Sequence, residues 1–201
     1  MPLPVEEPVE GIRRAVGDLP GDEGVWFFVI ADMAMFAVFF LLFMAGQAQD
    51  PDTYRQSRGM LDPMMGLLNT LILLVSGWWV VRAVEAARQD RWLPARRRVI
   101  LALIVGLGFA VVKVLEYSAK IEAGIGLNTN EFFTYYFAFT GIHLLHFVVG
   151  IGVLLIILAR IGRAEDASRL RWLEAGATYW HMVDLLWLLL FPMLYLAGGV
   201  S

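Results

Sequence analysis

Five apolar stretches, each long enough to cross a lipid bilayer as a helix, dominate this sequence. A membrane-spanning helix needs about 20 consecutive, mostly apolar residues. The stretches are residues 25–45, 64–84, 99–117, 132–159 and 173–196. Hydrophobic residues make up 59% of the chain and charged residues only 17%, a smaller charged share than soluble domains carry. We therefore predict an all-α fold, an integral membrane bundle of five transmembrane helices.

The distribution of Lys and Arg predicts how this bundle is oriented. Twelve of these residues fall on the side that holds the N-terminus and 4 on the other side. Because basic loops stay in the cytoplasm, we predict a cytoplasmic N-terminus and a periplasmic C-terminus. Residues 1–24 are polar, acidic and rich in proline, so we predict a cytoplasmic tail there. Residues 25–201 form the five-helix transmembrane domain.

The last apolar stretch carries two ionisable residues, His181 and Asp184. Residues three apart lie on the same face of a helix. Ionisable side chains inside a membrane span are costly unless they face protein or water, so this face is expected to look into the bundle. Pro192 removes one backbone hydrogen bond, which predicts a local kink near the far end.

The other spans carry polar residues that we expect at two depths, counted at about 1.5 Å per residue. Asp32, on the first span, shares the cytoplasmic half with His181 and Asp184. The second level, nearer the outer side, holds Asn69, Lys113, Glu116, His143 and His146. We expect these residues to form a structural polar network, in which Lys113 and Glu116 neutralise each other.

The two carboxylates of the cytoplasmic level differ in their expected roles. We expect Asp184 to contact His181 or a backbone donor and to be structural. Asp32 is either a buried anchor or a proton-related carboxylate that stays protonated or meets lipid or water. Because both carboxylates lie at one depth, we expect the first and last spans to be neighbours or to share a polar cleft.

Three readings of the histidines are open. His143 and His146 have the spacing of two metal ligands on one helical face, and His181 with Glu116 could complete a metal site. A small membrane b-type cytochrome would instead hold a haem between two histidines. With three His, no Cys and no Glu-x-x-His pair, we predict interior histidines and no metal or cofactor.

Two further classes of function were weighed. A proton-coupled transporter would use Asp32 and Asp184, but such transporters favour a repeated arrangement of broken helices that this sequence lacks. A net charge of −3 argues against a nucleic-acid partner.

Residues 179–187, YWHMVDLLW, resemble the last-helix motif of subunit III of haem–copper terminal oxidases. Further segments agree in the family's order: Asp32, residues 67–70 (LLNT), Glu116-Tyr117, residues 141–146 (GIHLLH) and residues 174–176 (EAG). The opening residues 21–26 (GDEGVW) look most like the branch associated with bacterial nitric oxide reductases. The long form of the family has seven helices, and this chain matches the last five. The family commonly has Glu where this chain has Asp32.

The resemblance implies a role and partners. The family's fold is a helical bundle that encloses phospholipid in a cleft, packs beside a catalytic subunit I-type haem–copper protein and binds no haem or copper of its own. It implies a non-catalytic accessory subunit of an oxidase or nitric oxide reductase in the bacterial cytoplasmic membrane. It also implies a candidate role for Asp32 in supplying protons from the cytoplasmic side. Candidate lipid-binding residues are Trp26, Trp180, His181 and Trp187.

Overall fold

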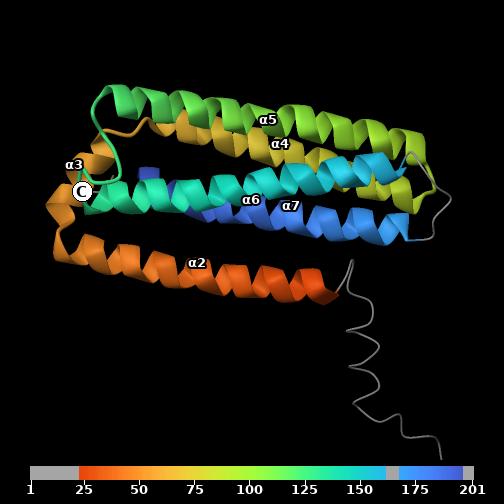
Figure 1. Cartoon of the computed structure of the whole chain (residues 1–201), viewed down its shortest axis with the longest axis horizontal. Coiled ribbons are helices and arrows are strands. Elements are labelled where there is room, and N and C mark those ends of the chain that lie inside the picture. The colour runs from red at the N-terminus through yellow and green to blue at the C-terminus, as the bar shows by residue number, and fades with distance from the viewer. Residues whose placement is uncertain (1–22, 162–167, 197–201) are drawn as a thin grey trace, which may run out of the picture.

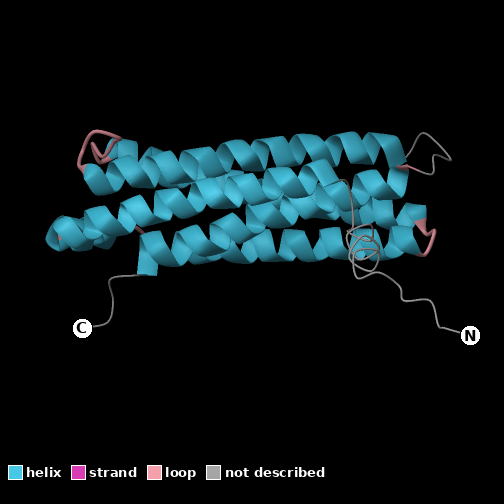
Figure 2. Ribbon diagram, turned by 90° about the horizontal axis from the view of Figure 1, so that it is seen from below, coloured by secondary structure: helices cyan, strands magenta, loops and turns pink. Residues whose placement is uncertain are grey.

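The computed structural model describes residues 23–161 and 168–196. This part of the chain is helical with short connections, and it contains no strand (Figure 2). The helices are α2 (Glu23–Gln49), α3 (Pro51–Gly59), α4 (Pro63–Arg88), α5 (Trp92–Glu122), α6 (Glu131–Ile161), α7 (Arg169–Phe191) and the π-helical turn η1 (Pro192–Leu196). The tail predicted for residues 1–24 lies outside the described residues, except for Glu23 and Gly24 at the start of α2.

The prediction of five membrane-spanning helices is confirmed, since five helices in the described part of the chain are long and apolar enough to cross a bilayer. The helices extend beyond the apolar stretches, because helical hydrogen bonding continues into the polar residues at the membrane surface. The Arg-rich segment between the second and third apolar stretches, residues 82–98, is therefore mostly helical. Only three residues, 89–91, separate α4 from α5.

Helix α3, in the polar segment between the first two apolar stretches, is not among the predicted helices. Asp50 begins this helix, and its carboxylate accepts a hydrogen bond from the Thr53 N–H at 3.2 Å. Pro51 stands at the first helical position, where its missing N–H costs nothing. This Asp-Pro pair, repeated as Asp62-Pro63 at the start of α4, is the local signal that could have predicted the helix.

Helices α4, α5, α6 and α7 form a ring in which each helix packs against the next, and α2 packs outside it against α6 and α7 (Figure 1). The prediction that the first and last spans are neighbours is confirmed. The rings of Phe28 on α2 and Tyr179 on α7 lie 5.9 Å apart. Helix α2 is the least buried of the five spans and α7 the most buried, so α7 organises the bundle.

Glycines let the other helices approach the large side chains of α7. A Cβ at Gly106 on α5 or at Gly150 on α6 would lie 3.0 Å from the ring of Trp180. The indole therefore fills the centre of the ring between two glycines. Small residues at such contacts are the usual means of close packing between membrane helices.

The disturbance predicted at Pro192 is present. Helix α7 ends at Phe191 and the chain continues as η1. A single π-helical turn accommodates a missing backbone hydrogen bond without ending the helical path. The turn points Tyr195 into the bundle, where it is 4% exposed.

Gly77 on α4 supplies a test of this packing. A Cβ there would lie 2.3 Å from the Oδ2 atom of Asp184, so Gly77→Ala should displace that carboxylate and separate α4 from α7. We expect a loss of stability of about 1–3 kcal/mol, the usual effect of overpacking, measured as a lower melting temperature in detergent. The matched control is Gly152→Ala, since a Cβ at Gly152 meets nothing within 4 Å. Equal melting temperatures for the two variants would contradict this packing.

Candidate functional site

Asp32 on α2 pairs with His146 on α6. The Oδ1 atom of Asp32 lies 3.1 Å from Nε2 of His146, and the two side chains are 5% and 13% exposed. The rings of Phe28 and Phe36 lie 6.4 Å and 6.0 Å from the imidazole and shield the pair. Our expectation that His146 belongs with His143 at the outer level is wrong, because its ring turns toward α2 and contacts Asp32.

The hydrogen bonds of His146 indicate where the protons of this pair lie. Its Nδ1 atom lies 2.8 Å from the carbonyl oxygen of Ile142, which can only accept. Nδ1 therefore carries a proton, and Nε2 faces Asp32. A contact between Nε2 and Oδ1 requires one proton between them, either on the imidazole or on the carboxyl group. Asp32 thus shares a proton with a residue of a second helix.

His181 and Asp184 form a second pair on α7, as predicted, with 3.5 Å between Nδ1 and Oδ2. The pair faces α4, where the absence of a side chain at Gly77 makes room for Asp184. The His181 side chain is 40% exposed and lines a groove of ≈ 290 Å³ with Glu85, Arg88 and Glu174. Arg88 and Glu174 close the groove with an ion pair of 2.9 Å.

The two pairs lie at similar depth, as predicted, but they do not share a cleft. Phe28 contacts Tyr179, and the first and last spans run in the same direction, so Asp32 lies about level with Asp184. Asp32 faces α6, whereas Asp184 faces α4. The two pairs lie on different sides of α7, so of the two predicted alternatives, neighbouring helices or a shared polar cleft, the first holds.

Lys113 and Glu116 pair as predicted, at 2.8 Å, but far from the surface, with side chains 1% and 2% exposed. The hydroxyl of Tyr195 accepts a hydrogen bond from Lys113 Nζ at 3.0 Å and donates to Glu116 Oε1 at 2.5 Å. The ammonium also lies 4.7 Å from the ring centre of Trp187. Sequence reasoning missed Tyr195, because only the π-helical turn after Pro192 aims it at this pair.

The three histidines have separate environments. His143 lies between the rings of Phe109 and Trp187, each 5.3 Å away, while His146 faces Asp32 and His181 faces Asp184. Within residues 23–161 and 168–196, no three His, Cys, Asp or Glu side chains come together as a metal site would require. No two imidazoles face each other as a bis-histidine haem needs.

The candidate lipid-binding residues divide by position. Trp180 and Trp187 are 0% exposed and pack among the side chains of the ring, so neither can touch lipid at the surface of this chain. That part of the prediction is corrected, because the glycines of α5 and α6 admit the ring of Trp180 into the interior. Trp26 and His181 are partly exposed and stay candidates.

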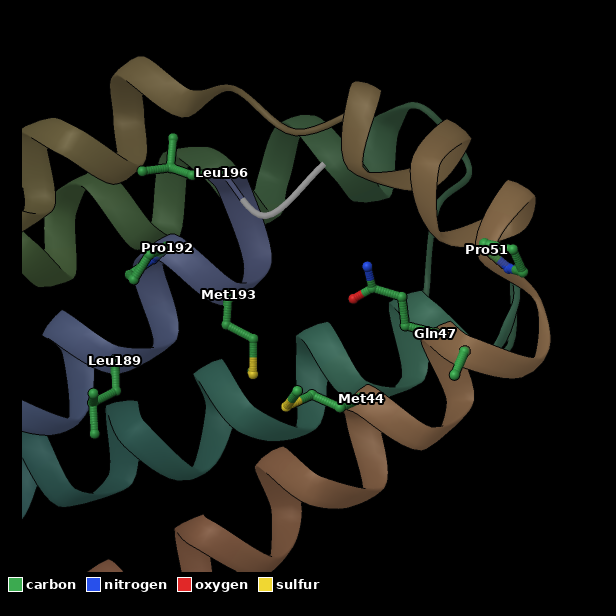
Figure 3. Close-up of a pocket in the computed structure, with 8 residues that line it drawn as sticks. Met44, Gln47, Pro51, Leu189, Pro192, Met193 and Leu196 are labelled. Atoms are coloured by element: carbon green, nitrogen blue, oxygen red, sulfur yellow. The ribbon is translucent and has the colours of Figure 1, made fainter. Parts of the chain in front are cut away.

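An open apolar pocket of ≈ 660 Å³ lies where α2 and η1 end. It is lined by Met44, Gln47, Ala48, Pro51, Leu189, Pro192, Met193 and Leu196. Figure 3 shows Met44 and Met193 reaching toward each other across it, with the amide of Gln47 beside them. The sequence analysis did not predict this pocket, because its two walls are about 140 residues apart in the chain.

Arg58 of α3 makes the polar contacts beside this pocket. Its guanidinium donates to the carbonyls of Leu194 and Met193 at 3.2 Å and 3.3 Å, and to Gln47 Oε1 at 3.3 Å. These carbonyls belong to the last helical turn, which lacks partners of its own. Burial lowers the pKa of Arg58 from its ordinary value. Burial, and then the carboxylate of Glu131, raise the pKa of Tyr54 on the same helix.

The family model of cytochrome c oxidase subunit III matches residues 19–199. The chain belongs to the cytochrome c oxidase subunit III family. The identification made from residues 179–187 and the shorter motifs is confirmed. The family works with the catalytic subunit I of haem–copper oxidases and consists of non-catalytic, accessory subunits of oxidoreductase complexes, as the sequence predicted.

Individual relatives agree with this assignment. The chain is 30% identical to cytochrome c oxidase subunit 3 of Aedes aegypti, over 88% of this chain and 69% of that protein. It is 25% identical to a probable quinol oxidase subunit 3 of Staphylococcus epidermidis, over 88% of this chain and 89% of that protein. It is 26% identical to the haem–copper oxidase subunit I+III of Aeropyrum pernix, where the match covers 86% of this chain but only 22% of that protein.

The pairing of Asp32 with His146 is tested by a double-mutant cycle. Removing either partner leaves the other buried without its proton-sharing contact, so Asp32→Ala and His146→Ala should each lower the melting temperature in detergent. The double variant should lose less than the sum, with a coupling of about 0.5–3 kcal/mol.

The exposed pair Asp52–Arg55, whose side chains are 80% and 69% exposed at 3.9 Å, is the control and should show almost no coupling. Additive losses at Asp32 and His146 would mean that the two side chains do not interact.

Proposed function

We propose that this chain is the accessory subunit of a respiratory haem–copper complex in the bacterial cytoplasmic membrane, packed beside a catalytic subunit I-type protein. The match of the family model to residues 19–199 carries this proposal. The relative from Aeropyrum pernix supports it, because its name joins subunits I and III in one chain. The complex reduces oxygen or nitric oxide, and the choice between them belongs to the catalytic partner.

The physical design of the bundle supports a structural role. The charged pairs of the interior are already matched within the chain, and its outer surface is apolar over the spans. Such a surface can pack against another membrane subunit and against lipid without rearrangement. The chain contributes neither haem nor metal of its own in this proposal, and its stability supports that of its partner.

Lipid is the second component of the proposal. The pocket between α2 and η1 is lined by apolar side chains and belongs to two membrane-spanning segments. A phospholipid acyl chain matches this lining, and Trp26 and His181 lie on other faces where lipid can reach them. Such bound lipid would hold α2, the least buried span, against the ring.

Proton supply is the third component. The pair Asp32–His146 holds one proton between two helices, and its carboxylate is 5% exposed. In our proposal it contributes to proton uptake on the cytoplasmic side by storing and returning that proton.

The proposed orientation can be tested by labelling single cysteines, which is direct because the natural chain has no cysteine. Arg97→Cys lies in the Arg-rich turn at the start of α5, and Gly126→Cys lies in the loop at the opposite end. With a cytoplasmic N-terminus, a membrane-impermeant thiol reagent added to intact cells should label position 126 and spare position 97. Labelling at position 97 alone would reverse the topology.

Co-purification tests the proposed role. The full chain, tagged and expressed at its native level, should bring down a haem-containing catalytic subunit from native membranes, identified by mass spectrometry. The chain purified alone should show no haem absorption. Haem bound stoichiometrically to the isolated chain would instead support the membrane cytochrome. Recovery without any oxidase or reductase subunit would refute the accessory role.

A further inference from the structure

A buried polar layer crosses the four-helix ring in the half of the bundle where α4 and α6 begin and α5 and α7 end. It takes one residue from each helix: Asn69 from α4, Lys113 from α5, His143 from α6 and Trp187 from α7. All four are 0% or 1% exposed. We call these four residues the polar layer.

The register of α4 and α5 places Asn69 level with Lys113. Ser76 donates to the carbonyl of Ala102 at 2.8 Å, and a Cβ at Gly106 would lie 3.2 Å from the Ser76 hydroxyl. The two helices run in opposite directions. Two turns back from Ser76 is Asn69, and two turns on from Gly106 is Lys113.

The other two helices meet the same level. The hydroxyls of Tyr117 on α5 and Thr140 on α6 lie 2.6 Å apart, so Lys113, one turn back, is level with His143, one turn on. Trp187 is placed by direct contacts. Its ring centre lies 5.3 Å from that of His143 and 4.7 Å from Lys113 Nζ.

Two members of the polar layer have polar atoms with no hydrogen-bond partner in the described part of the chain. These are both amide atoms of Asn69 and both ring nitrogens of His143. The ring centre of Tyr136 lies 5.4 Å from Lys113 Nζ, beside this layer. Lys113 Nζ donates one hydrogen bond to Glu116 and one to Tyr195, and it lies 4.7 Å from the ring centre of Trp187; a third N–H can still donate.

Buried polar atoms in native proteins are almost always hydrogen-bonded to protein or to ordered water. The chemistry of these atoms indicates the ligand. The Asn69 amide offers both a donor and an acceptor, neutral His143 offers one of each, and Lys113 offers a donor. The positive charge of Lys113 would repel a metal cation, and the rings of Phe109 and Trp187 each lie 5.3 Å from that of His143. Water is the small molecule that both donates and accepts.

We propose that the polar layer is an internal water-binding site, in which ordered water bridges Asn69 and His143 to the neighbouring polar groups. A buried water typically makes about three hydrogen bonds to groups of this kind. The ion pair of Lys113 and Glu116 is then hydrated from within the bundle, although both side chains are closed off from the surface. This inference does not depend on which catalytic partner the chain joins.

A structure of the full chain in its native complex tests the site directly, at a resolution that shows ordered water elsewhere in the same map. Density for water is expected within hydrogen-bond distance of the Asn69 amide and of a His143 ring nitrogen. Absence of such density at both groups would overturn the proposal, whatever the variants below show.

The melting temperature of variants gives a second test, because it should change in opposite directions depending on whether water is bound at Asn69 or the site is dry. If Asn69 binds water, Asn69→Leu leaves that water and its other partners short of a bond, and the melting temperature falls. If the amide is dry, the same variant removes an unsatisfied polar group and the melting temperature rises. His143→Phe, which keeps a ring between Phe109 and Trp187, is expected to behave as Asn69→Leu does.

The control Thr70→Val gives the scale of the effect, because Thr70 Oγ1 accepts from Trp187 Nε1 at 3.0 Å. The variant leaves that N–H unpaired at the same level of the bundle and should lower the melting temperature. The proposal would be overturned if the melting temperature of Asn69→Leu equalled or exceeded that of the natural chain while the melting temperature of Thr70→Val was lower.

Discussion

The cost of placing an ionisable group in lipid governs this structure. An uncompensated charge at the centre of a membrane helix costs at least about 2.5–3.5 kcal/mol on insertion scales. The chain meets this cost with short contacts between charged and polar side chains. Lys113 contacts Glu116 and Tyr195, Asp32 contacts His146, and Asp184 contacts His181.

These contacts also set the relative positions of the helices. The contact of Asp32 with His146 ties α2 to α6, and Tyr195 ties the end of the chain to α5. Between lipid-like surfaces there is little hydrophobic drive for helices to associate, so packing and such polar contacts decide which helices meet. Glycines at positions 77, 106 and 150 then allow the approach that the contacts require.

Much of this arrangement could be predicted from the sequence. Composition and length gave the spans, and helical spacing gave the pairs Lys113–Glu116 and His181–Asp184, because both partners lie three residues apart on one helix. Contacts between helices are different. Asp32 and His146 are 114 residues apart, and the rotation of α6 about its own axis decides whether His146 faces α2 or the ring. A rotation of this kind has no signal in residue spacing.

The same reasoning explains why the depth of a polar side chain in the bundle was predicted better than the neighbouring helix that it faces. Counting residues along a helix gives depth at about 1.5 Å per residue, so Asp32 and Asp184 were correctly placed at one level. Which side of α7 each carboxylate faces depends on small residues of neighbouring helices, such as Gly77, whose meaning appears only in the packed bundle.

Helix α2 has one face that packs against the protein and other faces that are exposed. Its inner face carries Phe36, Phe43 and Asp32, which pack against α6 and Tyr54 or pair with His146. Its other faces expose large apolar residues such as Phe27, Ile30 and Leu41. An aromatic contact lacks a unique geometry, whereas the Asp32–His146 contact fixes both the rotation and the depth of α2. The span with the least protein around it is therefore positioned by polar contacts at separate points along its length, Asp32 with His146 and Gln47 with Arg58.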